Sequence, residues 1–403
     1  MLSLIACASS VKLDSKGNHM TTKIMKKGFT IVELLVVVSI IALLIAILLP
    51  AIGKARDAAL ITQSLGNLRN LSAANSAYGA DYNDRQFTAV PDEIGMYGDA
   101  ITPACTAMVT TQCIPQMILG WDSGGGLWGY WIPGAPARCG TWPGQGCGNF
   151  VTYQACDFWG AAARWEGSWR LTNCKAFNSY VGGKFYDKVF WAPKDKITLA
   201  RVDKYFSTPV EFNYDGVNFE QPTYCWSPSA MWSPDVMAWS RKTGNGSSAV
   251  FGAKPTKATM PGAFKSPAAG LAQYPSLKWR MWEHQWLQNT EGGEVNPAFS
   301  TPTPWFYNQG YNSAPATLCF DGHTQVVSIA GIQQDNDLAL AQAVNSTGSS
   351  VASGSLWFVA SGGANSYYST AAYDMLTTGN GSCSAGVLTV DGILGRDMLR
   401  IGD

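Results

Sequence analysis

The sequence has few of the residues that enzymes commonly use for acid–base and nucleophilic chemistry. Three of its 403 residues are histidines, and only His284 and His323 lie beyond residue 29. No G-x-S-x-G, H-E-x-x-H or phosphate-loop motif occurs. We therefore predict that the chain is not an enzyme. Glycoside cleavage by two acids stays open as an alternative, because the spacing of such acids is spatial rather than sequential.

Charge is also scarce, at 14% of residues, with 28 basic and 28 acidic side chains. The first 28 residues hold five lysines and one acid, Asp14, so the rest of the chain is net acidic. A basic surface for nucleic acid is therefore missing, and we expect no nucleic-acid partner.

Cysteines at C-x-x-C spacing are absent as well, which argues against a zinc or thioredoxin-type site. Six of the cysteines lie between Cys105 and Cys174, in a segment that is poor in charge and rich in glycine, proline and tryptophan. We expect such a loop-rich segment to need disulfides to hold its structure. Disulfides persist mainly outside the cytoplasm, so we predict an extracytoplasmic domain with disulfides of unknown connectivity. Nine is an odd number, so at least one cysteine stays free or pairs between chains. The nine candidates are Cys105, Cys113, Cys139, Cys147, Cys156, Cys174, Cys225, Cys319 and Cys383.

One long apolar run dominates the N-terminal region. From Phe29 to Ile52 the only ionisable side chain is Glu33. As a helix this run is about 36 Å long, enough to span a bilayer. Lysines precede it, so the positive-inside rule predicts a cytoplasmic N-terminus and an outer location for the residues after Pro50.

The sequence GFTIVE, from Gly28 to Glu33, resembles the processing site of type IV pilins and type II secretion pseudopilins. The resemblance extends over Lys26 to Pro50. It implies that a prepilin peptidase removes residues 1–28 as a leader by cutting after Gly28, and that it methylates the new amine of Phe29. Either Met1 or Met20 is the start of that leader. An ordinary membrane anchor is the alternative, but it leaves the order of lysine, Gly28 and Phe29 unexplained.

An isolated carboxylate in lipid costs roughly a few kcal/mol, so Glu33 requires a partner. We expect this partner to be the Phe29 amine, either of the same chain or of a neighbour in a filament, where the pair fixes subunit register. Pro50 removes one helical hydrogen bond, which predicts a bend or melted stretch around Ala42 to Pro50. A kink at the membrane boundary explains Pro50 equally well.

After residue 52 the helical pattern becomes amphipathic over residues 53–84. We expect one helix from Thr30 to about Ala80, whose outer half packs on a globular domain. The segment from Ser64 to Arg85 resembles large pilin-like proteins of planctomycetes, many of which have cysteine where this chain has Ser64. The apolar positions of the stripe are Ile61, Leu65, Leu68, Leu71 and Tyr78.

Residues 85–330 show no persistent helical period between Asp92 and Pro315, and they predict a mostly antiparallel sheet with long loops. Lys188–Trp191 and Val210–Tyr214 are examples of expected strands. Residues 331–403 are rich in serine, glycine and alanine, and we interpret them as an extension that packs on a neighbour. The fold class expected is α+β.

Asp321, Gly322 and His323 follow a strand-like run and precede another, which predicts a hairpin turn. In the planctomycete proteins a histidine often lies ten positions before the Asp-Gly pair, and here Tyr311 occupies that position. We therefore favour a turn over a metal or catalytic role.

Three further groups are candidate ligand sites. Asp81, Asn83 and Asp84 form an oxygen-rich cluster for calcium, although such residues also end helices and form turns. The Glu283–His284 pair is a weak signal for catalysis. Exposed tryptophans stack on sugars, but packing in a core or interface is the interpretation we prefer. The tryptophan candidates are Trp128, Trp131, Trp142, Trp282 and Trp286.

These features predict a structural filament subunit that assembles with itself through its N-terminal helix, without a cofactor other than the candidate calcium. The resemblance implies a prepilin peptidase and an inner-membrane assembly platform as partners. It also implies an inner-membrane precursor that becomes an extracellular filament or a periplasmic pseudopilus. The alternatives are a minor pilin or adhesin, or a tethered carbohydrate-binding protein or hydrolase that uses the same export route.

Overall fold

A computed structural model of the chain divides into two compact units, residues 1–56 and 57–403. Each unit is described by itself. The structure describes residues 30–87, 96, 98–99, 118–121, 127–129, 172–208, 211–212, 222–231, 233–234, 256–258, 261, 265–283, 314–328, 331, 334–335, 338, 389 and 392–399.

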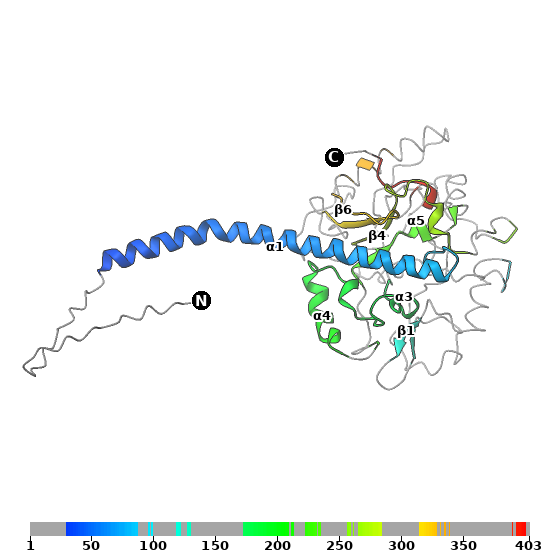
Figure 1. Cartoon of the computed structure of the whole chain (residues 1–403), viewed down its shortest axis with the longest axis horizontal. Helices are drawn as coiled ribbons and strands as arrows, with labels where there is room; N and C mark the ends of the chain where they lie inside the picture. The colour runs from blue at the N-terminus through cyan, green and yellow to red at the C-terminus, as the bar shows by residue number, and fades with distance from the viewer. Residues whose placement is uncertain are drawn as a thin grey trace, which may run out of the picture. The chain divides into compact units, whose positions relative to one another are not determined.

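A single long helix, α1, spans Ile31–Asp81 and confirms the predicted helix to within one residue at each end (Figure 1). It ends in a turn in which Asn83 and Asp84 have positive φ angles of 56° and 60°. Asparagine and aspartate tolerate this left-handed conformation better than other non-glycine residues, which explains why the helix stops here.

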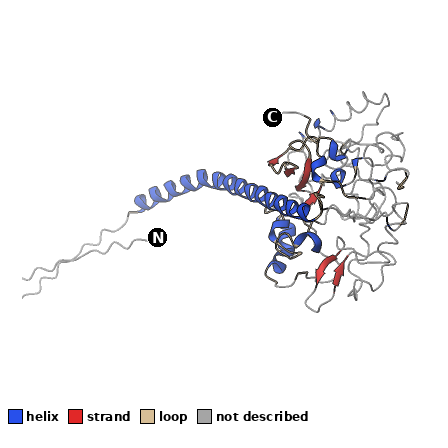
Figure 2. Ribbon diagram, turned by 45° about the vertical axis from the view of Figure 1, so that its right-hand side comes forward, coloured by secondary structure: helices blue, strands red, loops and turns tan. Residues whose placement is uncertain are grey.

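The second unit contains a four-stranded antiparallel sheet in the order β3-β4-β5-β6. This sheet and α1 confirm the α+β class. A separate hairpin is formed by β1 (Ile118–Trp121) and β2 (Leu127–Gly129), apart from the larger sheet (Figure 2). The bounds of the sheet strands are Tyr224–Trp226 for β3, Trp279–Glu283 for β4, Ala316–Cys319 for β5 and Thr324–Val326 for β6.

Every residue of β3, β4 and β5 is buried, so these strands do not alternate between core and solvent. Strands covered on both faces lack the period-two signal that a half-exposed sheet gives. The core around them is aromatic, which accounts for much of the tryptophan and phenylalanine in the sequence. Its largest fully buried side chains are Trp191, Trp226, Trp279, Trp282, Tyr224, Phe87, Phe177, Phe185 and Phe190.

Two expectations for the middle of the chain are wrong. The predicted strand at Lys188–Trp191 is instead a 3-10 turn, η5 (Lys188–Phe190), because the Asp187 carboxylate accepts a hydrogen bond from the Val189 N–H and caps the turn. A helix of 11 residues, α4 (Lys196–Phe206), also lies where no helical period was expected. Asp195 caps it by accepting from the Thr198 N–H at 3.0 Å.

The remaining described elements are short: α3 (Lys175–Asn178), α5 (Pro228–Met231), η8 (Ala269–Leu271) and η9 (Gly392–Leu394). In the other predicted strand, Glu211 and Phe212 are described and both lie outside any strand.

The described end of the chain belongs to the sheet-containing unit. Ile393 is fully buried, and the backbone N–H of Asp397 donates to the Leu277 carbonyl at 2.9 Å. The Asp397 carboxylate accepts in turn from the N–H of Trp279, the first residue of β4, at 2.7 Å. Residues 392–399 therefore pack within the sheet-containing unit of their own chain, and an extension of residues 331–403 that packs on a neighbour stays a prediction.

Candidate processing and assembly segment

The first part of α1 presents an almost uninterrupted apolar surface. All described residues from Thr30 to Ala59 are exposed, and 16 of them, from Ile31 to Ile52, are large hydrophobic side chains. By length and composition α1 is apolar enough to cross a membrane, with a mean hydropathy of 3.2 in its most apolar window. Such a surface requires either lipid or other protein to cover it.

Glu33 and Thr30 form a reciprocal cap at the start of this helix. The Glu33 carboxylate accepts from the Thr30 backbone N–H and from the Thr30 hydroxyl, each at 2.9 Å. The Thr30 hydroxyl in turn accepts from the Glu33 N–H at 3.2 Å. This is the capping box of a Thr-x-x-Glu sequence, in which two backbone donors of the first turn are satisfied at once.

The capping box holds the Glu33 carboxylate against Thr30, the residue that follows Phe29. Gly28 and Phe29 lie outside the described residues, so the predicted pairing of Glu33 with the Phe29 amine stays a prediction. The cap also supplies a second role for Glu33 that sequence reasoning missed, although the Thr-x-x-Glu pattern could have shown it.

Pro50 lies inside α1, and every residue from Ala42 to Pro50 is helical. The melted stretch predicted around this proline is therefore absent from the structure. Proline has no N–H to donate, so the helix continues here with one backbone hydrogen bond fewer.

The later part of α1 is an amphipathic helix, as predicted. Leu68, Leu71 and Tyr78 are buried, while Ile61 and Leu65 are half-buried. Two polar residues, Ser64 and Asn75, are also buried on this face. Sequence reasoning missed them because a hydrophobic pattern does not mark a polar residue whose partners come from distant strands.

Ser64 is hydrogen-bonded to two residues of the sheet. Its hydroxyl donates to the Glu283 carboxylate on β4 and lies 2.7 Å from the Tyr224 hydroxyl on β3. Because the Ser64 proton is engaged, Tyr224 is the donor in the second contact. Burial, and secondarily the charge of Glu283, raises the pKa of Tyr224 well above its ordinary value, which keeps that donor proton in place.

Glu283 therefore has a structural role in the buried core. Its second oxygen accepts from the Ala316 N–H on β5 at 3.1 Å, so this one carboxylate joins α1, β4 and β5. The partner predicted for it in a catalytic pair, His284, lies outside the described residues.

Asp321 and His323 form the predicted hairpin between β5 and β6. Gly322 has a φ of 87°, and the His323 ring nitrogen Nδ1 lies 2.6 Å from the Asp321 carboxylate. Asp321 also accepts from the His323 N–H at 3.1 Å, as residues of such turns commonly do. Tyr311 lies outside the described residues.

Two of the three calcium candidates, Asp81 and Asp84, accept hydrogen bonds from protein donors. Asp81 accepts from the Tyr180 hydroxyl at 2.7 Å, and Asp84 accepts from the Gly270 N–H at 3.2 Å. The part of the chain that the structure describes contains no group of three or more His, Cys, Asp or Glu side chains placed for a metal. Calcium at Asp81, Asn83 and Asp84 stays a prediction.

The sugar-stacking interpretation is wrong for Trp282, which is fully buried in β4 and packs against Trp279 with ring centroids 6.2 Å apart. Trp128 lies on β2, and its side chain is not described. The other three candidates, Trp131, Trp142 and Trp286, lie outside the described residues.

The predicted disulfides are not present at the described cysteines. Cys174, Cys225 and Cys319 are buried, and none of the three is in a disulfide. Burial raises the pKa of Cys174 to about 12 and raises that of Cys319 as well, so both remain thiols. An apolar core accepts cysteine as a small hydrophobic residue, and these three fill such positions. The other six candidates, Cys105, Cys113, Cys139, Cys147, Cys156 and Cys383, lie outside the described residues.

Comparison with known protein families identifies the prokaryotic N-terminal methylation motif at residues 24–49. This match covers Gly28, Phe29, Glu33 and the apolar half of α1. The N-terminal segment is therefore a type IV pilin-like prepilin segment, and with the apolar helix it indicates a membrane-anchored precursor. Comparisons with curated proteins and with solved structures found no match.

Proposed function

We propose that this chain is the structural subunit of a type IV pilus-like filament or pseudopilus, assembled after cleavage between Gly28 and Phe29. The observation that carries the proposal is the coincidence of the methylation motif with an apolar helix whose surface is exposed from Ile31 to Ile52. A soluble monomer rarely leaves so large an apolar surface uncovered.

The partners follow from this assignment. A prepilin peptidase removes the leader and methylates Phe29, and an inner-membrane platform extracts the subunit from the bilayer. In the filament the same apolar surface is buried against copies of itself. Because this surface is already out of water in the membrane, the transfer gains little hydrophobic free energy. Specificity therefore comes from packing and from the Glu33 charge.

The test is mass spectrometry of the mature N-terminus on filaments sheared from cells. We expect a methylated Phe29 as the first residue and this chain as the bulk component. A chain that retains residues 1–28 contradicts processing. A processed chain that is scarce in the filaments contradicts the role of main subunit and favours a minor pilin or adhesin.

A further inference from the structure

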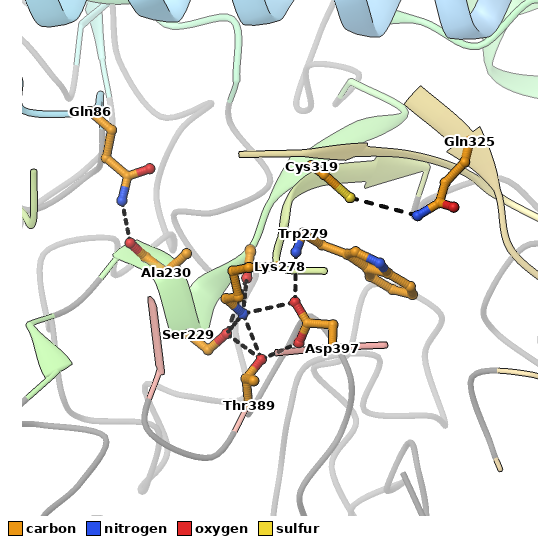
Figure 3. Close-up of polar contacts among 10 residues, drawn as sticks. Gln86, Ser229, Ala230, Lys278, Trp279, Cys319, Gln325, Thr389 and Asp397 are labelled. Carbon is orange, nitrogen blue, oxygen red and sulfur yellow. Dashed lines mark hydrogen bonds and ion pairs between the residues drawn. The ribbon is translucent and has the colours of Figure 1, made fainter. Parts of the chain in front are cut away.

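Lys278 and Asp397 form an ion pair that is closed off from solvent. The Lys278 Nζ lies 2.9 Å from Oδ2 of Asp397, a contact drawn in Figure 3. Both side chains have 0% exposure. Lys278 immediately precedes β4, whereas Asp397 lies 119 residues later in the segment 392–399. A salt bridge of this kind brings little net stability, because both ions lose their hydration.

Hydrogen-bonding groups surround the pair on both sides. The Trp279 backbone N–H donates to Oδ2 of Asp397 at 2.7 Å. The Thr389 hydroxyl is placed between the partners: it accepts from Lys278 Nζ at 2.6 Å and donates to Oδ1 of Asp397. Ser229 Oγ accepts a further hydrogen bond from Lys278 at 2.8 Å.

Burial favours the uncharged form of the lysine. Desolvation lowers the pKa of Lys278, although the charge of Asp397 opposes this shift. Passing one proton from the ammonium to the carboxylate converts the ion pair into an amine and a carboxylic acid, and so removes two buried charges. An uncharged amine in contact with a carboxyl group, with water excluded, is a reactive pair.

We propose that Lys278 and Asp397 join in an intramolecular amide bond. In this reaction the neutral Nζ attacks Cγ of Asp397 to form the new N–C bond. The C–Oδ1 bond then breaks, and Oδ1 leaves as water with two protons: the one already passed from the ammonium to the carboxyl group and the one that Nζ loses as the amide forms. The products are one amide and one water molecule, with no change of oxidation state and no co-reactant.

Two of the neighbouring groups, the Trp279 N–H and the Thr389 hydroxyl, have a role in this step. The Trp279 N–H stabilises negative charge on Oδ2 in the tetrahedral intermediate, as backbone donors do in acyl transfer. The Thr389 hydroxyl contacts both Nζ and Oδ1, so it is placed to pass a proton from the attacking nitrogen to the leaving oxygen. The bond closes a covalent link between the start of β4 and the C-terminal segment.

The chain offers an internal control. Lys175 and Glu211 are also in contact, with Nζ 2.6 Å from Oε1, but their side chains are 35% and 37% exposed. Water reaches both side chains, so this pair lacks the desolvation of Lys278 and Asp397, and we expect no amide there. Proximity alone therefore does not predict the bond, and desolvation distinguishes the two pairs.

Peptide mass spectrometry of the mature wild-type chain tests the proposal. An amide blocks tryptic cleavage after Lys278, so residues 266–280 remain one peptide, joined to residues 397–400 with the loss of one water mass. Recovery of the two peptides separately and in full yield overturns the proposal. This result is independent of N-terminal cleavage, so it does not depend on the filament role.

Variants test the chemistry. Asp397→Ala yields a chain without the joined peptide. Thr389→Val keeps both reacting groups but removes the proton relay, and we expect it to slow bond formation by about 100-fold. A Thr389→Val chain that is joined as fast as the wild type contradicts the relay. A wild-type chain joined instead at Lys175 and Glu211 contradicts the role of burial.

Discussion

Arg280 on β4 donates a hydrogen bond of 2.6 Å from Nη2 to the Asn75 side-chain oxygen on α1. Asn75 has no exposed surface and Arg280 is 4% exposed. Burial lowers the pKa of Arg280 to about 10, and the charge of Asp84 acts in the opposite direction. Within the described residues, Asn75 is the hydrogen-bond acceptor of this guanidinium, and the Phe320 ring lies 5.4 Å from it. One polar contact therefore holds a buried cation against α1.

Replacing Asn75 with leucine removes that acceptor, so the buried guanidinium of Arg280 loses its hydrogen bond to α1. We expect a loss of about 3 kcal/mol in the free energy of unfolding. Urea unfolding of the mature chain in detergent measures the change. Ser76→Ala is the matched control, because Ser76 is exposed on the next position of α1 and its hydroxyl donates to the Ser72 carbonyl.

The double variant Asn75→Leu with Arg280→Met separates lost packing from an unpaired charge. When both polar partners become apolar, most of the stability is expected to return. A double variant whose loss equals the sum of the two single losses is inconsistent with a coupled pair.

Two glycines of the second unit give opposite predictions for the same substitution. Gly66 is inside α1, and a Cβ there meets nothing within 4 Å, so Gly66→Ala should stabilise by up to about 1 kcal/mol. Gly322 has a φ of 87° in the β5–β6 turn, so Gly322→Ala should destabilise by about 1 kcal/mol through backbone strain. Thermal unfolding of both variants checks the signs, and equal shifts in one direction contradict the account.

The sequence predicted α1, the Asp-Gly hairpin and the α+β class because each rests on a local signal. The run from Phe29 to Ile52, the stripe from Ile61 to Tyr78 and the Asp321–Gly322 pair carry periodic or turn information by themselves. β3 and β4 were not identified, because strands buried on both faces have no alternation to detect.

The polar contacts of the core were not predictable for a different reason. Ser64 and Glu283 are 219 residues apart, and Lys278 and Asp397 are 119 apart, so no local pattern links them. The disulfide prediction is wrong at the three cysteines that the structure describes. A dense set of cysteines indicates disulfides, yet an aromatic core accepts Cys174 and Cys319 as small buried side chains.

Two of the three buried cysteines, Cys174 and Cys319, make a prediction about chemical reactivity. Thiolate is the form that iodoacetamide attacks, and burial raises the pKa of both Cys174 and Cys319. The folded chain should therefore leave both unmodified at mildly alkaline pH. Both should react in urea without a reductant, as monitored by peptide mass spectrometry. Ser76→Cys, on the exposed face of α1, should react at once and serves as the control. Reaction in urea only after reduction would place these residues in disulfides.

Asp195 makes stability depend on pH in the direction opposite to most carboxylates. Burial is the largest influence and raises its pKa above the ordinary value of 3.8, against the hydrogen bonds from Thr198 and Thr223. An acid with a raised pKa contributes stability that is fully present below its unfolded pKa and is lost as pH rises through the folded one. Asp195→Asn keeps the cap without the charge.

The stability of Asp195→Asn relative to the wild type should therefore increase as pH rises from below 3.8 towards neutrality. Urea midpoints of the two chains over a pH series measure this difference. A difference that stays constant, or that decreases with rising pH, contradicts the raised pKa.

Glu33 has two roles to separate: the capping box with Thr30 and the charge proposed to meet the Phe29 amine. Glu33→Gln retains the first, because a glutamine oxygen accepts from the Thr30 N–H as well as a carboxylate does. Glu33→Gln does remove the charge that is proposed to meet the Phe29 amine. Glu33→Ala removes both. Ser39→Ala is the control within the same apolar segment, since the Ser39 hydroxyl donates to the Val36 carbonyl of its own helix.

If the charge drives assembly, Glu33→Gln and Glu33→Ala should both lower the yield of sheared filaments by about tenfold or more, with the leader still removed. The physical reason is that a methylated amine in an apolar filament core needs an anion, and a neutral amide does not supply one. Quantification of filaments and of the mature N-terminus in the same cells measures both effects. A Glu33→Gln chain that assembles like the Ser39→Ala control, beside a Glu33→Ala chain that does not, would show that the cap alone matters and that the proposed ion pair is wrong.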